Sequence, residues 1–132
     1  MITIAGAALD AIAAAARRAA PAECCGLLLG AGDAVTEAVE ARNISASLNR
    51  FIIDPADHIA IRRDARQRHL DVAGFYHSHP HSAPHPSETD RAEAAYPGHL
   101  YLIVSLADGG EEARLFRLEN DQFVEEAFVV AR

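Results

Sequence analysis

Residues 75–90, FYHSHPHSAPHPSETD, concentrate side chains that can bind a metal ion. In an extended chain alternate side chains point the same way, so His77 and His79 can reach one ion while Ser78 faces away. A carboxylate, Asp90, follows after a short loop. Two neutral imidazole nitrogens and one carboxylate oxygen suit zinc, and three protein ligands leave the fourth tetrahedral position to water. An open position of this kind is typical of a catalytic rather than a structural metal site.

Asp90 has a second interpretation, as part of a helix cap. Ser87 with an acidic residue three positions later fits a capping box at a helix N-terminus. One carboxylate cannot serve both purposes fully, and a bound cation outweighs a cap worth about 1 kcal/mol. We therefore assign Asp90 to the metal and leave capping to Ser87 or to water.

The other histidines are weaker candidates for metal binding. His81 and His85 lie in a proline-containing loop, where either one could supply a fourth ligand and close the site, or both could be solvated. His58 and His69 fall on a predicted helix and His99 follows a turn, so we expect surface or rim positions for them.

Upstream, Glu23 and two adjacent cysteines open the apolar run CCGLLLG. The spacing of Cys24 and Cys25 suits neither a redox pair nor a metal clamp, so we expect reduced, buried core residues. Only Cys25 shares a strand face with Glu23. A water on zinc needs a carboxylate to take its proton. Position alone does not single out one glutamate for this role, and Glu23 could equally be a solvated residue at a strand end.

The sequence pattern predicts the helices and strands that position these residues. An Ala-rich segment closed by Pro21, a segment capped by Asp54 with Pro55 in its first turn, and a segment stopped by Pro97 favour helices. The predicted helices cover residues 7–20, 55–69 and 87–96. The strand pattern predicts strands at 24–30, 34–41, 50–54, 72–79 and 100–107, and two or three closing strands within 111–130 with a tight connection at 119–121.

Length and composition predict a single domain over residues 1–132, because half of the 132 residues are hydrophobic. The net charge of −7, the pI near 5.4 and the scattered arginines argue against a nucleic-acid partner. Asp10, Arg17 and Arg18 interrupt the Ala-rich run, which argues against a signal peptide or membrane span and favours a cytoplasmic protein. Exposed edge strands near the C-terminus would allow a homodimer.

Taken together, these residues resemble the JAMM metalloproteases, also called MPN-plus or JAB domains. That family has an upstream glutamate, then His-x-His-Pro, then Ser-x-x-Asp, with ten residues between the second histidine and the aspartate, as here. The matching residues are Glu23 in PAECCGLLLG, His77, His79 and Pro80 in HSHP, and Ser87 and Asp90 in PSETD. The order of elements and the segment RFIIDP also resemble small bacterial members, so the likeness covers nearly the whole chain.

The resemblance implies an α/β fold of the cytidine-deaminase-like type, with three α/β/α layers around a mixed sheet. It further implies one zinc ion held by His77, His79 and Asp90, with water as the fourth ligand. Glu23 would then be the general acid/base and Ser87 the donor that steadies the oxyanion. The expected enzyme is a zinc metallopeptidase or isopeptidase.

Small stand-alone bacterial members resemble enzymes that act at the C-terminus of ubiquitin-like sulfur-carrier proteins, which makes such a tail the expected substrate. The chain lacks room for the long insertions with which lysine-63-specific members grip a second ubiquitin, so we expect no linkage selectivity. Two other functions stay open: a non-catalytic MPN-type scaffold, whose usual mark is broken ligands, and a peptidase for a cell-wall or phage-tail peptide.

Overall fold

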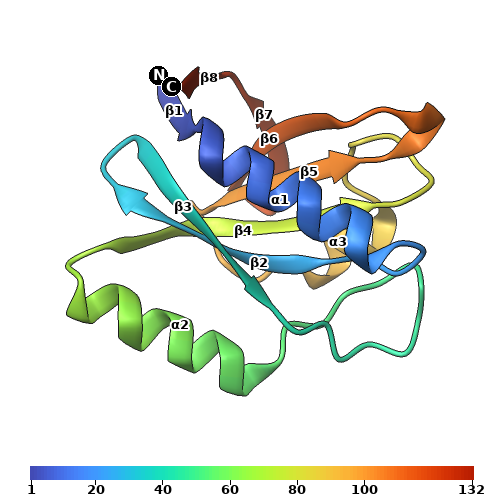
Figure 1. Cartoon of the computed structure of the whole chain (residues 1–132), viewed down its shortest axis with the longest axis horizontal. Helices are drawn as coiled ribbons and strands as arrows, with labels where there is room; N and C mark the ends of the chain where they lie inside the picture. Colours follow the sequence, from blue (N-terminus) through green and yellow to red (C-terminus); the bar gives the residue numbers. More distant parts are fainter.

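A single mixed sheet organises the computed structural model, which describes all residues from 1 to 132 (Figure 1). Its eight strands run in the order β7-β6-β5-β4-β2-β3-β1-β8. The strands are β1 (Ile2–Ala5), β2 (Cys25–Ala31), β3 (Ala34–Ala41), β4 (Asp71–His79), β5 (Leu100–Ser105), β6 (Glu112–Glu119), β7 (Gln122–Glu126) and β8 (Phe128–Ala131). The helices are α1 (Gly6–Ala19), α2 (Pro55–Gln67) and α3 (Glu88–Glu93), with one 3-10 turn at Ala107–Gly109.

The helices cover the two faces of the sheet (Figure 1). Alternate residues of β2 point to opposite sides, as the pleat requires: Leu28 belongs to the core cluster under α1, whereas Leu27 belongs to the cluster under α2. Ile12 of α1 is buried in the first cluster and Ile61 of α2 in the second. The predicted α/β/α layering around a mixed sheet is confirmed.

The two edge strands of the sheet, β7 and β8, are consecutive in the chain, so the sheet must curl to bring its edges near each other. The run QFVEEAFVV, which reads as one alternating strand, breaks at Ala127 into β7 and β8. β7 forms a hairpin with β6 through Asn120 and Asp121, both with positive φ (50° and 63°), as a two-residue hairpin turn requires. β8 instead pairs in parallel with β1 at the opposite end of the strand order. The tight connection at 119–121 is thus confirmed.

Two predictions about local structure are wrong. Residues 50–54 form no strand, and their only ladder contact is an isolated bridge between Asn43 and Ile53. β4 already pairs with β2 and β5, so Phe51 stacks on the His77 ring instead of joining the sheet there. The third helix ends at Glu93 rather than near residue 96, since the residue before Pro97 is biased away from helical geometry. The sequence pattern does not predict β1, because four residues are too few to show the alternation of apolar and polar side chains that marks a strand.

The remaining elements lie within a few residues of their predicted bounds, and none of the helices has the length and apolar character needed to cross a membrane. The two edge strands, β7 and β8, are the last two strands of the chain. Formation of a homodimer through these edges stays a prediction.

The start of α2 is fixed by the predicted cap. The Asp54 carboxylate accepts from the Ala56 amide at 3.1 Å, and Pro55 opens the helix. We expect Asp54→Ala to lower the free energy of unfolding by about 1 kcal/mol, since it leaves that amide without a partner. Asp54→Asn, which keeps the acceptor, should cost markedly less. Urea denaturation compares the two; equal losses would show that the cap contributes little.

Candidate metal centre

Strand register brings the upstream glutamate to the histidine pair. β4 lies between β2 and β5, and Cys25 of β2 pairs with His77 of β4 in antiparallel register. One step further, the Ser78 amide donates to the Cys24 carbonyl at 3.2 Å. Continuing this register sets Glu23 opposite His79, on the same face as His77. The face shared by Cys25 and Glu23 agrees with the sequence prediction.

Three ligating atoms converge at the C-terminal end of β4. The Nε2 atoms of His77 and His79 lie 3.3 Å apart, and the Oδ2 atom of Asp90 lies 3.1 and 3.0 Å from them. Both histidines are buried, and Asp90 is delivered by the first turn of α3. These residues form the group whose donor atoms could share one metal ion.

The chemistry of this group fits a tetrahedral cation. Nδ1 of His79 lies 2.8 Å from the carbonyl oxygen of Ala83, which can only accept, so Nδ1 carries a proton and Nε2 is the nitrogen available to a metal ion. Burial opposes protonation of this ring, but Asp90 and the Ala83 carbonyl outweigh it and raise the pKa of His79. With Nε2 deprotonated, its lone pair and the Asp90 oxygen would both face a cation bound between them. Zinc bonds of about 2.0–2.1 Å at tetrahedral angles give ligand separations of about 3.3 Å, close to those observed.

Asp90 caps α3 and also faces the two histidines, although a cap and a metal-facing position were expected to exclude each other. Its Oδ2 atom accepts from the Ser87 amide at 2.9 Å, and its own amide donates to the Ser87 hydroxyl at 3.0 Å, which completes a capping box. The expectation that Asp90 would not cap is therefore wrong. A carboxylate oxygen has more than one lone-pair direction, so the same atom can accept from the amide and still face the imidazoles.

The charge on Asp90 is favoured by its surroundings. Burial opposes ionisation, but the two imidazoles and the Ser87 amide outweigh it and hold the pKa of Asp90 below its ordinary value. Burial lowers the pKa of His77, which keeps that imidazole neutral. An ionised carboxylate beside a neutral imidazole is the protonation state that metal binding needs.

Glu23 is a buried carboxyl group whose side chain makes no hydrogen bond. Its side chain is only 6% exposed, and its Oε1 atom has no hydrogen-bond partner. Burial raises its pKa to about 7; Asp90 adds to the rise and His79 opposes it. A carboxyl group poised near neutrality can both accept and release a proton at physiological pH. Of the two interpretations left open, the solvated strand-end residue is wrong.

The remaining candidates separate into buried thiols and exposed histidines. Cys24 and Cys25 are both free and buried, and burial raises their pKa values to about 11 and about 12, so neither is a thiolate. His81 and His85 are exposed and lie outside the group of three donor atoms. Neither His81 nor His85 therefore adds a donor atom to this group, and the open fourth position stays a prediction.

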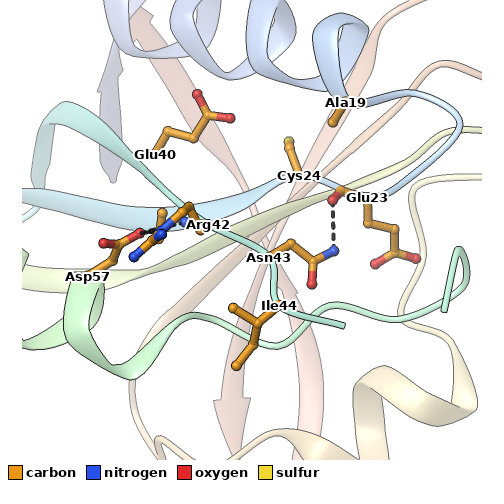
Figure 2. A pocket seen from close by; sticks show the side chains of 9 residues that line it. Ala19, Glu23, Cys24, Glu40, Arg42, Asn43, Ile44 and Asp57 are labelled. Atoms are coloured by element: carbon orange, nitrogen blue, oxygen red, sulfur yellow. Dashed lines mark hydrogen bonds and ion pairs between the residues drawn. The ribbon is translucent and has the colours of Figure 1, made fainter. Parts of the chain in front are cut away.

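Three contacts around the centre were not predicted from the sequence. The ring of Phe51 stacks on His77 with 4.5 Å between centroids, and the Arg50 guanidinium beside it makes a bidentate ion pair with Glu93 of α3. Asn43 donates its side-chain amide to the Glu23 carbonyl at 2.9 Å (Figure 2). All three come from the segment between β3 and α2, where the strand pattern of residues 50–54 gives no sign of these contacts.

Comparisons with known proteins agree with this geometry. The family model described as prokaryotic homologs of the JAB domain matches residues 6–119. The desampylase of Haloferax volcanii is 41% identical over 111 residues, which cover 79% of this chain and 80% of that protein. The CysO-cysteine peptidase of Mycobacterium tuberculosis is 29% identical over 121 residues, 89% of this chain and 83% of that protein.

Solved structures match over almost the whole chain. A protein from Desulfitobacterium hafniense has a TM-score of 0.89 at 31% identity, covering 99% of this chain and 93% of that one. A JAB1/MPN domain protein from Archaeoglobus fulgidus has a TM-score of 0.67 at 22% identity, covering 100% and 98%, which supports the fold alone. The chain therefore belongs to the family of prokaryotic homologs of the JAB domain.

Proposed function

We propose that this chain is a zinc-dependent peptidase that hydrolyses an amide bond at or near the C-terminus of a ubiquitin-like or sulfur-carrier protein. The observation that carries the proposal is the meeting of three converged ligand atoms with a buried, unpartnered carboxyl group on the same sheet face. We further propose that residues 1–132 work as one domain, which the single sheet supports.

His77, His79 and Asp90 would hold the ion. Zinc, when bound, supplies a Lewis acid that acidifies water and polarises a carbonyl group. Glu23 takes the proton of the attacking water and passes it to the departing amine, for which a pKa of about 7 is well suited. Ser87 has a hydroxyl group that accepts from the Asp90 amide and still has its own proton to donate to a developing oxyanion.

The names of the relatives support the choice of substrate. One is a desampylase and the other a CysO-cysteine peptidase, and each aligns with about four fifths or more of this chain. We infer that the substrate here is likewise a small carrier protein with a short C-terminal extension or an isopeptide-linked partner. The non-catalytic scaffold is disfavoured because the ligand residues and Glu23 are all present and brought together.

The direct test combines metal analysis with a cleavage assay. Elemental analysis of the natively purified protein should find about one zinc per chain. The zinc-loaded protein is then incubated with ubiquitin-like and sulfur-carrier proteins bearing C-terminal extensions, and product masses are read. We expect release of the extension after the carrier's last residue, and a chelator should abolish it. Failure to cleave any carrier, combined with cleavage of a cell-wall peptide, would favour the other peptidase function.

A further inference from the structure

Asn43 lies just beyond the end of the backbone pairing between β2 and β3, two residues past the last pair. The ladder between β2 and β3 pairs Cys25 with Ala41 and goes no further. Continued by two residues, that register would set Glu23 opposite Asn43. The two segments are no longer paired there, and Asn43 forms an isolated bridge with Ile53 instead. The side-chain amide of Asn43 then donates to the Glu23 carbonyl at 2.9 Å, in place of the missing backbone bond (Figure 2).

The same side chain also closes the loop that follows. Its Oδ1 atom accepts from the amides of Ser45 and Ile52, at 3.0 and 2.9 Å. The side-chain amide of Asn43 thus connects both ends of the 44–52 loop to the backbone of Glu23. Glu23 and Asn43 also line one cavity of about 480 Å³, which His77, His79 and Asp90 do not line.

We propose that Asn43 is a positioning residue, which aligns Glu23 by bonding its backbone and couples that alignment to the 44–52 loop. The inference rests on the proposed function of Glu23. The Oε1 atom of Glu23 has no hydrogen-bond partner, so the placement of the carboxyl group depends on where the backbone sets the base of the side chain and on the packing around it. Asn43 contributes the one side-chain hydrogen bond made to Glu23. A displacement of about 1 Å at a reacting group can cost about 100-fold in rate.

The test uses Asn43→Asp, which keeps an acceptor for the Ser45 and Ile52 amides but loses the donor to the Glu23 carbonyl and the longer bond to the Arg50 carbonyl, at 3.4 Å. Asn49→Asp is the matched control, because it makes the same change of charge at an exposed position of the same loop. Zinc content, kcat and KM for a cleaved carrier, and amide hydrogen exchange are measured for both variants. We expect Asn43→Asp to bind zinc normally, with kcat reduced by about 10-fold or more and KM changed by less than about 3-fold.

Hydrogen exchange supplies a readout that does not depend on activity. The Cys24 amide donates to the Ser78 hydroxyl in the last rung before Glu23, so fraying there should speed its exchange by about 10-fold in Asn43→Asp. The amides of Leu27 and Leu28, deeper in β2, should not change. Exchange at Cys24 equal to that of the control, or an unchanged kcat, would overturn the proposal. Absence of cleavage by the wild-type protein counts against the proposed function, and the exchange result still decides the role of Asn43.

Discussion

Glu23→Gln is expected to reduce kcat for carrier cleavage by about 1,000-fold while zinc content stays at the wild-type level. General acid/base catalysis contributes about 100- to 10,000-fold, and the amide has the size of the carboxyl group but takes up no proton from water. Zinc is retained because Glu23 lies outside the group of converged ligand atoms. The measurement pairs steady-state kinetics with elemental analysis of the same preparation.

The same substitution should stabilise the metal-free protein at alkaline pH. Burial raises the pKa of Glu23 from 4.5 to about 7, so the folded protein favours the neutral form. Stability from this group is complete below pH 4.5 and is lost as the pH rises through 7, where the folded protein must hold an unpartnered charge. Glutamine does not titrate, so the variant escapes this loss, which is at most about 3 kcal/mol.

Urea denaturation of the chelated proteins at pH 5 and pH 8 checks this sign. The variant should exceed the wild type at pH 8, and the difference should shrink at pH 5. Wild-type kcat in Glu23→Gln would remove Glu23 from the mechanism. A variant less stable than the wild type at pH 8 would mean that the carboxylate has a stabilising partner after all.

Asp90→Asn should weaken zinc binding by about 100-fold or more without disrupting α3. The variant keeps an oxygen that can accept from the Ser87 amide, so the cap survives, but it loses the negative charge that faces the two imidazoles. Charged oxygen ligands contribute most of their affinity through that charge, and changes merely adjacent to ligands already cost 10- to 100-fold. Competition with a chromophoric chelator measures the zinc affinity.

Two matched variants separate the metal role of Asp90 from its role as a cap. Glu88→Gln removes a charge from the same first turn of α3 at an exposed position, and should leave zinc affinity unchanged. Ser87→Ala removes the hydroxyl that caps the Asp90 amide, and should lower the free energy of unfolding by about 1 kcal/mol with zinc affinity within a few-fold of wild type. Zinc affinity of Asp90→Asn equal to that of Glu88→Gln would exclude Asp90 as a ligand.

Features that depend on neighbours in the chain were predictable from the sequence. The alternation of a strand places His77 and His79 on one face, and this needs no tertiary information. The cap at Asp54 and the hairpin turn at Asn120 and Asp121 are likewise local choices of backbone geometry, and the structure confirms them.

Features that depend on pairing between distant segments were decided by the tertiary structure. Glu23 meets His79 because β2 and β4 pair in one register, and a shift by one residue would turn Glu23 to the other face. Phe51 lies in a segment of strand-like residues, but it packs on His77 because the sheet already has its partners there. Periodicity describes which face a residue occupies; it does not describe which strand lies beside it. The sequence alone therefore determined the candidate ligand residues and their spacing, whereas the pairing of distant strands determined that Glu23 and its hydrogen bond from Asn43 lie beside them.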